Sequence, residues 1–477
     1  TGGNTNMVFT VTRAGDLASS VAVAYSTADG TAVAGQDYTA QSGTVTIPSG
    51  QASATISVPV IGDNLDEADE TFFVNLTGVT NVVGAPIVLG GRQDFASPGT
   101  GPVGAVTADF NSDGRLDTAA ANRGAGSIGV FVNTSTPGSA ITFTGGQFFS
   151  AGSDPHGIVA ADFNGDGRAD LAVSNAAADT VSVLMNTTPS GSPSITFAPR
   201  QAFATGTTPV PVATGDVNRD GRPDLAVANF NSGTFSILLN TTAVGAAAPS
   251  FAPRVDFAVG SNPDYGGVKL ADFNNDGNLD AIVSNRSANT VSILRNTTTP
   301  GATAPTFSTQ QTFATAATPR GVSIADANGD GRLDLAVAAA DANAVSVWFN
   351  TTPLGASTFS LGPRFDVPAG TRPFGVAWAD MNGDFRPDLT VAARDSNSVV
   401  TLLNRTLPGV PSATFDTVGA VTVGSNPHDV VAADLNNDGL NDVVSSNLGG
   451  DSISVLASST SIGAAAIFPA FPQTSFP

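Results

Sequence analysis

The chain has 477 residues, of which 12% are charged and 41% hydrophobic, and its formal net charge is −21. Lys269 is its only lysine. Such acidity argues against nucleic acid or anionic membranes as partners, because both are bound by clustered Lys and Arg. Cysteine is absent, which excludes disulfides, and no apolar run reaches the roughly 18 residues that a membrane span requires. The chain begins at Thr1 with no signal peptide, so we expect a processed chain or a fragment of a secreted protein.

Residues 1–88 predict a small antiparallel β-sandwich. Hydrophobic and polar residues alternate there in short segments separated by turns, which is typical of half-buried strands. The segments are residues 8–12, 21–25, 43–47, 54–58 and 71–76.

Three stretches of this region, residues 26–32, 35–38 and 66–72, resemble the Calx-β domain. The resemblance implies a calcium site, for which the candidate ligands are Asp29, Asp63, Asp66 and Glu67. Acidic residues on surface turns are the alternative interpretation.

Two parts of the Calx-β pattern are missing, namely its first strand, which would lie before Thr1, and its last acidic cluster. An incomplete sheet edge invites strand addition. We therefore expect either removed upstream residues or self-association, for which the Pro/Phe-rich tail at 461–477 is a possible donor.

A nine-residue motif, first seen as DFNSDGRLD from Asp109, recurs seven times. Successive first aspartates are 53, 54, 56, 54, 54 and 54 residues apart. Apolar strands flank each motif, as at 157–161 and 171–174, and two more strands follow near 181–185 and 197–203. Four strands in each repeat predict a propeller blade. We therefore expect an all-β chain with a seven-bladed β-propeller over residues 89–460.

Closing such a ring requires a fourth strand for the last repeat. Residues 91–96 resemble the fourth strands of the other repeats but precede the first motif, so we predict that they complete the seventh blade. The C-terminal tail ranks second, because its prolines cannot donate ladder hydrogen bonds.

Each motif has the composition of a loop that binds a hard cation. Asp at positions 1, 5 and 9 and Asn at position 3 supply oxygen ligands, and Gly at position 6 allows a sharp turn. These aspartates are 21 of the 40 acidic residues. Good turn formers alone would explain one or two of these residues, not five at fixed positions in seven copies. We predict about seven Ca²⁺ ions, with position 7, usually Arg, contributing only its carbonyl.

The predicted ligands are the Asp and Asn residues of the seven motifs. They are Asp109, Asn111, Asp113, Asp117, Asp162, Asn164, Asp166, Asp170, Asp216, Asn218, Asp220, Asp224, Asp272, Asn274, Asp276, Asp280, Asp326, Asn328, Asp330, Asp334, Asp380, Asn382, Asp384, Asp388, Asp434, Asn436, Asp438 and Asp442. Phe385 replaces Gly in the sixth motif, and Leu440 and Asn441 depart from the pattern in the seventh.

The motifs resemble the FG-GAP/VCBS repeat family, and the resemblance extends over residues 91–460. Propellers of that family include the head of integrin α chains and many bacterial exported proteins. The resemblance implies Ca²⁺ on the loops that join the first and second strands of each blade, with ligands bound at the opposite face.

Residues before the first strands are expected to line the channel mouth away from calcium. Their chemistry varies between repeats, as on a ligand-reading surface, although solvated turns free to vary are the alternative. The candidates are His156, Tyr265, Arg320, Phe374 and His428. The pattern Asn-x-Ser/Thr recurs at the same place in six repeats. Its asparagines are either glycan acceptors or turn-forming residues. They are Asn133, Asn186, Asn240, Asn296, Asn350 and Asn404.

No nucleophile elbow, zinc-binding His pair or Walker loop occurs, so we do not expect an enzyme. We expect a secreted or cell-surface protein of adhesion, matrix or filament assembly, whose partners are other protein subunits or extracellular glycans. A lectin that uses the channel mouth is one alternative. A polysaccharide-active enzyme is another, because a carboxylate pair need not be close in sequence.

Overall fold

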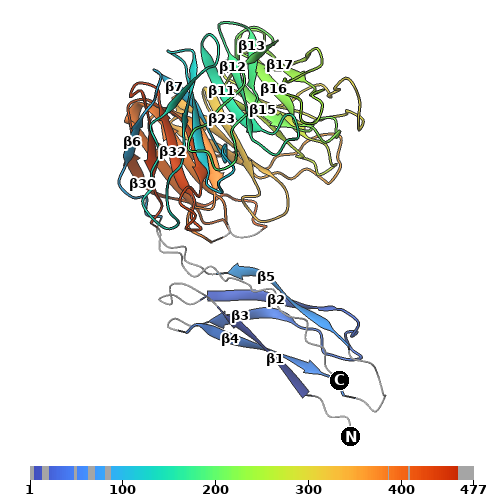
Figure 1. Cartoon of the computed structure of the whole chain (residues 1–477). Helices are drawn as coiled ribbons and strands as arrows, with labels where there is room; N and C mark the ends of the chain where they lie inside the picture. The colour runs from blue at the N-terminus through green and yellow to red at the C-terminus, as the bar shows by residue number, and fades with distance from the viewer. Residues whose placement is uncertain are drawn as a thin grey trace. The chain divides into compact units, whose positions relative to one another are not determined.

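The computed structural model describes residues 5–12, 21–47, 51–62, 70–80, 87–384, 386–406 and 409–459, without the side chains of 77–80 and 264–265. It confirms the all-β class: within these ranges the only helical elements are two three-residue 3-10 turns, Ala340–Ala342 and Arg394–Ser396. Two compact units form, one containing Thr1–Val88 and the other containing Leu89–Met381 and Arg386–Ser459 (Figure 1). Within the described residues, no helix has the length and apolarity needed to cross a membrane.

The smaller unit is the predicted β-sandwich. Its strands are β1 (Thr5–Thr12), β2 (Val21–Asp29), β3 (Ser42–Ile47), β4 (Ser53–Val60) and β5 (Phe72–Thr80). β1 pairs with β4, and the second sheet has the order β3-β2-β5. Val23, Ile47 and Val58 are fully buried between the sheets, where Tyr38 stacks on Phe72 with 4.3 Å between ring centroids.

The larger unit contains seven four-stranded antiparallel sheets. Their first strands are β7 (Pro102–Ala108), β11 (Pro155–Ala161), β15 (Pro209–Gly215), β19 (Pro263–Ala271), β23 (Pro319–Ala325), β27 (Pro373–Ala379) and β31 (Pro427–Ala433). The second strands are β8 (Asp117–Asn122), β12 (Asp170–Asn175), β16 (Asp224–Asn229), β20 (Asp280–Asn285), β24 (Asp334–Ala339), β28 (Asp388–Ala393) and β32 (Asp442–Asn447).

Two outer strands complete each sheet. The third strands are β9 (Ser127–Phe131), β13 (Thr180–Leu184), β17 (Thr234–Leu238), β21 (Thr290–Leu294), β25 (Ala344–Trp348), β29 (Ser398–Asn404) and β33 (Ser452–Leu456). The fourth strands are β10 (Gln147–Ser150), β14 (Gln201–Ala204), β18 (Val255–Ala258), β22 (Gln311–Ala314), β26 (Phe365–Pro368), β30 (Phe415–Thr422) and β6 (Gln93–Ala96).

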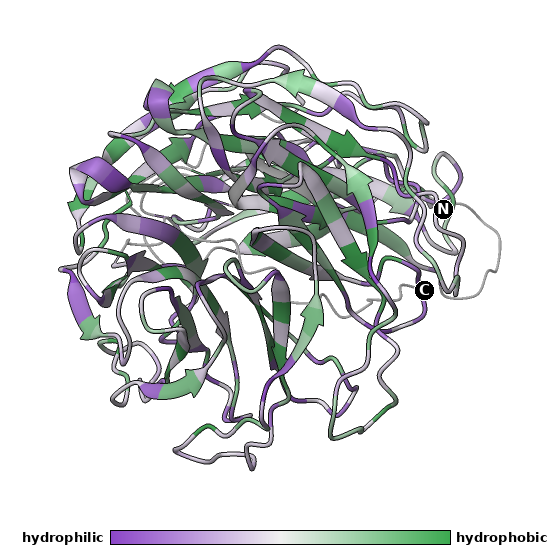
Figure 2. Cartoon of the chain, turned by 90° about the horizontal axis from the view of Figure 1, so that it is seen from above, coloured by the Kyte–Doolittle hydropathy of each residue, from purple (hydrophilic) through white to green (hydrophobic). Residues whose placement is uncertain are grey.

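The first strands pack side by side in the order β7, β11, β15, β19, β23, β27 and β31, and β31 packs against β7. The sheets radiate from these strands, as in a β-propeller (Figure 2). Every residue of the second strands is buried, because neighbouring sheets cover both of their faces. Phe110, Phe163 and Phe273 fill the space between sheets. Their rings lie 5.9–6.1 Å, centroid to centroid, from those of Phe197, Phe251 and Phe359.

The last sheet is completed by a strand from the beginning of the repeat region. β6 pairs antiparallel with β33, with Phe95 opposite Ile453 and Asp94 opposite Ser454. This pairing confirms the prediction for residues 91–96. The competing candidate, the C-terminal tail, lies outside the described residues.

β19 differs from the other first strands. Its pairing with β20 shifts between Pro263 and Val268, whereas β11 shifts only between Pro155 and Ile158. The two additional residues explain the 56-residue spacing in the sequence. Near this bulge the backbones approach closely, since a Cβ on Gly266 would lie 3.3 Å from the Cα of Gly321.

Candidate functional site

Each acidic motif forms the loop between the first and second strands of a sheet, as predicted. The position 6 glycine has a left-handed backbone in all six loops where it occurs, with φ between 82° and 87° at Gly114, Gly167, Gly221, Gly277, Gly331 and Gly439. Phe385, which takes this position in the sixth loop, lies outside the described residues. Because side chains are disfavoured at such φ values, glycine directs the turn.

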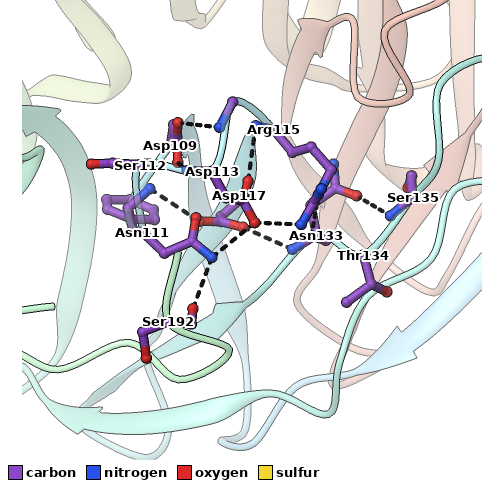
Figure 3. Close-up of polar contacts among 12 residues, drawn as sticks. Asp109, Asn111, Ser112, Asp113, Arg115, Asp117, Asn133, Thr134, Ser135 and Ser192 are labelled. Carbon is purple, nitrogen blue, oxygen red and sulfur yellow. Dashed lines mark hydrogen bonds and ion pairs between the residues drawn. The ribbon is translucent and has the colours of Figure 1, made fainter. Parts of the chain in front are cut away.

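The aspartates hold the backbone of the loop, as the first copy shows (Figure 3). Asp109 accepts hydrogen bonds from the backbone amides of Asp113, at 3.1 Å, and Gly114, at 2.8 Å. Asp117 accepts from the amides of Phe110, at 3.0 Å, and Asn133, at 2.7 Å. The position 1 bonds recur at Asp162, Asp216, Asp272, Asp326 and Asp434, and the position 9 bonds at Asp170, Asp224, Asp280, Asp334, Asp388 and Asp442.

The position 9 aspartates are fully buried. Burial raises the pKa of Asp117 to about 7; the two amide bonds oppose this shift, and the carboxylates of Asp113 and Asp109 add to it. The same causes raise the pKa of Asp170, Asp224, Asp280 and Asp334 to about 7 and that of Asp442 to about 6. Each loop thus carries a buried carboxylate beside two others, an arrangement that a bound cation would stabilise.

The donor set also fits a hard cation. The side-chain oxygens of Asn111, Asn218 and Asn274 are buried, and no described residue forms a hydrogen bond with them. Carboxylate and amide oxygens are the ligands that Ca²⁺ prefers. In the described residues no three Asp, Glu, His or Cys side chains converge as a metal cluster. In the first loop, the carboxylates of Asp109 and Asp117 accept hydrogen bonds from backbone amides.

The arginine at position 7 does more than was predicted. We expected only its carbonyl to matter, yet the Arg222 side chain forms an ion pair with Asp220 and donates from Nε to the backbone oxygen of Asn240 at 2.8 Å. Arg115, Arg168 and Arg332 make the same two contacts. The expectation that its identity is unimportant was therefore wrong, because the guanidinium neutralises position 5 and joins the loop to the end of the third strand.

The Asn-x-Ser/Thr asparagines are buried structural residues. Asn186 donates from Nδ2 to the backbone oxygens of Phe110, at 2.8 Å, and Ala169, at 2.9 Å, and its Oδ1 accepts from the amide of Thr188. Asn133, Asn240, Asn350 and Asn404 repeat all three bonds, and Asn296 repeats the bonds to the neighbouring sheet and to its own turn. Buried amides with these bonds are not glycan acceptors in the folded protein, so the turn-forming interpretation is the correct one.

A second tie between sheets comes from the position 3 asparagine. The backbone oxygen of Asn111 accepts from the amide of Gly191 at 2.6 Å, and its Nδ2 donates to the backbone oxygen of Ser192 at 2.9 Å. The backbone bond recurs between Asn164 and Gly245, Asn218 and Gly301, Asn274 and Gly355, Asn328 and Gly409, and Asn436 and Gly138. Six of the seven loops are therefore bonded to the next sheet, a role that the motif alone did not reveal.

The predicted ligand-reading residues are buried. His156 and Arg320 are 3% exposed, Phe374 is 4% exposed and His428 is 6% exposed. The Arg320 guanidinium lies 4.1 Å from the Phe374 ring centroid, and the His428 ring lies 5.0 Å from it. These residues form neither an open surface nor solvated turns, because the first strands approach closely here. The side chain of the fifth candidate, Tyr265, lies outside the described residues.

The smaller unit gives Asp29 a structural role. Its Oδ1 accepts hydrogen bonds from the amide of Ala34, at 2.9 Å, and from the hydroxyl of the buried Tyr38, at 2.7 Å. Burial and this bond raise the pKa of Tyr38. The other predicted ligands, Asp63, Asp66 and Glu67, lie outside the described residues.

Models of known domain and repeat families match both units of the chain. The model of the Calx-beta domain matches residues 2–89. The model of the FG-GAP-like repeat matches residues 109–173, 216–283, 272–337 and 329–391, and that of the FG-GAP repeat matches residues 155–194.

Individual relatives match only parts of the chain. Sodium/calcium exchanger 1 of Canis lupus familiaris is 44% identical over 69 residues, and sodium/calcium exchanger 3 of Homo sapiens is 42% identical over 69 residues. Each match covers 14% of this chain and only 7% of the exchanger. Among solved structures, BBS1N in complex with ARL6DN is 13% identical with a TM-score of 0.50, and the alignment covers 80% of this chain and 100% of that one. This likeness shows the fold alone.

Proposed function

Because the chain belongs to the FG-GAP-like repeat family and carries an N-terminal Calx-beta domain, we propose that it is a calcium-stabilised extracellular or cell-surface protein of adhesion, matrix or filament assembly. The observation that carries the proposal is the repeated acidic loop. In six of the seven copies, a loop with three aspartates is hydrogen-bonded to the neighbouring sheet through the backbone oxygen of its position 3 asparagine, as Asn111 is to Gly191. Calcium at such loops would make the integrity of the propeller depend on extracellular calcium.

The residues proposed to hold the ions are those at positions 1, 3, 5 and 9 of each loop. A bound Ca²⁺ supplies positive charge among clustered carboxylates. Seven ions would change the formal net charge from −21 to −7. The loop residues keep their backbone bonds to the adjoining sheet, so calcium would stabilise the contacts between sheets as well as single turns.

The smaller unit offers a way to self-associate. β1 pairs with β4 along its full length, and in the described part of the unit it pairs with no other strand. Val8, in the middle of β1, is 59% exposed. Strand addition from a second copy of the chain would pair the remaining edge of β1. We propose this contact as the route to filaments, and extracellular glycans as the alternative partners.

Sedimentation velocity in Ca²⁺, in Mg²⁺ and after metal removal tests the proposal, together with binding to cells and to a glycan array. We expect assembly or binding in Ca²⁺ only. If the calcium-loaded chain stays monomeric and binds neither cells nor glycans, the proposed role is wrong.

A substitution tests the strand-addition contact separately. Val8→Lys places a charge on β1 and should weaken assembly. Phe148→Lys is the control, because Phe148 is 56% exposed on the outer strand β10 of the propeller and should leave assembly unchanged. Equal assembly of both variants would exclude β1 as the contact.

We propose a binding role rather than a catalytic one. Supporting this, the two histidines, His156 and His428, are buried beside packed side chains, with His428 against Phe374. Turnover of an exopolysaccharide by the calcium-loaded chain would contradict this part of the proposal.

A further inference from the structure

The centre of the propeller holds a cavity of about 270 Å³ that all seven first strands line. Among the described residues that line the cavity, Lys269 is the only lysine and Asp429 is the only acidic residue. The cavity is separate from the acidic loops, whose aspartates do not line it.

One end of the cavity is closed and the other is open. Six of the seven first strands begin with buried residues and end with partly exposed ones: in β7, Pro102–Ala105 are buried and 106–108 are partly exposed. At the closed end, the guanidinium carbons of Arg320 and Arg394 lie 4.1 and 5.0 Å from the ring centroid of Phe374. The cavity therefore opens toward the end of the strands that leads into the acidic loops.

Lys269 is an isolated cation within this space. Water reaches its side chain, yet the surrounding protein lowers the pKa of the ammonium by desolvation, and Asp429 opposes that shift. Among the described residues, none forms a hydrogen bond or an ion pair with the ammonium. The corresponding positions of the other first strands are small or apolar, namely Val106, Val159, Ala213, Ser323, Ala377 and Val431.

Asp429 is the other isolated charge. It occupies the position that is glycine in five other first strands, at Gly104, Gly157, Gly267, Gly321 and Gly375. Its Oδ1 accepts from the amide of Val430 at 2.9 Å, and its Oδ2 accepts from the amide of Ala105 at 3.2 Å. Each oxygen keeps a second lone pair for another donor. The cavity thus presents one cation and one acceptor that do not form an ion pair with each other.

We propose that this cavity binds a small carboxylate that also carries hydroxyl or amino groups, with its carboxylate on Lys269 and a donor on Asp429. A cation that has lost part of its hydration to the surrounding protein is stabilised by an anion brought into contact with it. The volume lies just below the roughly 300–1,000 Å³ usual for ligand sites, so it suits a molecule of monosaccharide size. The competing explanation is that Lys269 and Asp429 neutralise each other at a distance and bind nothing.

Isothermal titration calorimetry of the calcium-loaded full chain tests this, with D-glucuronate, lactate, glycine, acetate and D-glucose as probes. We expect a carboxylate with a donor to bind, acetate to bind more weakly and glucose not to bind. Lys269→Met should weaken binding at least tenfold, whereas Lys269→Arg should retain most of it. Asp429→Asn should weaken the binding of the donor-bearing carboxylates more than that of acetate.

Arg200→Met is the charge-matched control, because it removes a positive charge from an exposed site outside the cavity and should leave binding unchanged. Thermal melting establishes that each variant is folded. If no carboxylate binds the wild type, or if binding is unchanged in the folded Lys269→Met variant, the proposal is wrong. Wild-type binding that Lys269→Met and Arg200→Met weaken equally would show a general charge effect and would also overturn it.

Discussion

The side-chain amide of Asn186 donates a hydrogen bond to the backbone oxygen of Phe110, 2.8 Å away in the neighbouring sheet. Phe110 directly follows the first aspartate of its acidic loop, and its own amide donates to Asp117. One residue of the loop is therefore bonded both to the position 9 aspartate and to the next sheet. This arrangement connects the local geometry of a loop to the packing between repeats, and the stability predictions below depend on it.

The first prediction concerns the buried asparagines. Asn240→Ala removes donors to the backbone oxygens of Phe163 and Pro223 and the acceptor for the amide of Thr242. Unsatisfied buried polar groups cost about 1–3 kcal/mol each, so the free energy of unfolding should fall by at least that amount in a denaturant titration. Asn231→Ala, in an exposed turn, is the control and should change it little. Equal effects of the two substitutions would contradict the structural role of Asn240.

The position 7 arginine should make a smaller contribution. Arg222→Leu removes the ion pair with Asp220 and the bond to the backbone oxygen of Asn240. Because the guanidinium is partly exposed, we expect a loss of less than about 1 kcal/mol in the unfolding free energy of the metal-free protein. The fourth loop, which has Asn278 at this position, provides a natural reference: Asn278→Leu should cost less than Arg222→Leu.

Glycine at position 6 should be required for its backbone conformation alone. Gly221 has a φ of 86°, and a Cβ there would meet nothing within 4 Å. Gly221→Ala should therefore cost about 1–2 kcal/mol from left-handed strain without a steric clash. Gly145→Ala also meets open space but at a φ outside the left-handed region, and its melting temperature should match the wild type. A neutral Gly221→Ala variant would refute this explanation.

His428 should make the protein sensitive to acid. Burial lowers its pKa well below the usual range, and His156, Arg320 and Arg394 add to that shift. Because the folded state favours the neutral imidazole, stability is complete above the unfolded pKa of about 6.5 and decreases as the pH falls below it. In saturating Ca²⁺, the denaturation midpoint of His428→Phe should depend less on pH between 8 and 5 than that of the wild type. Parallel pH profiles would contradict the assignment.

Calcium should raise the melting temperature well above that of the metal-free protein. Binding to the native state alone contributes about 2.7 kcal/mol for each site at a hundredfold excess over Kd. Differential scanning calorimetry with Ca²⁺, with Mg²⁺ and without metal measures this. Mg²⁺ should act more weakly, because it requires near-ideal octahedral geometry and gives up its bound waters reluctantly. If all three melting curves coincide, the loops do not bind the ion.

Much of the architecture follows from the sequence, because its determinants act locally. Asp109 bonds to amides only four and five residues ahead, so the spacing within one motif predicts the turn. The apolar segments around each motif likewise predict the four-stranded repeat. The resemblance of residues 91–96 to the fourth strands of the other repeats predicts that they complete the last sheet, and the pairing of β6 with β33 confirms this.

The tertiary structure decides everything that depends on segments from different repeats. Asn186 and Phe110 are 76 residues apart, so the sequence shows Asn186 as a glycan acceptor or a turn residue, not as a tie between sheets. His428 was likewise expected at an open channel mouth, but it is buried against Phe374. The sequence gives no sign that Lys269 lines a central cavity, because that cavity exists only where seven strands meet. Burial and long-range hydrogen bonds arise only when distant strands pack together, and no spacing within a single repeat encodes them.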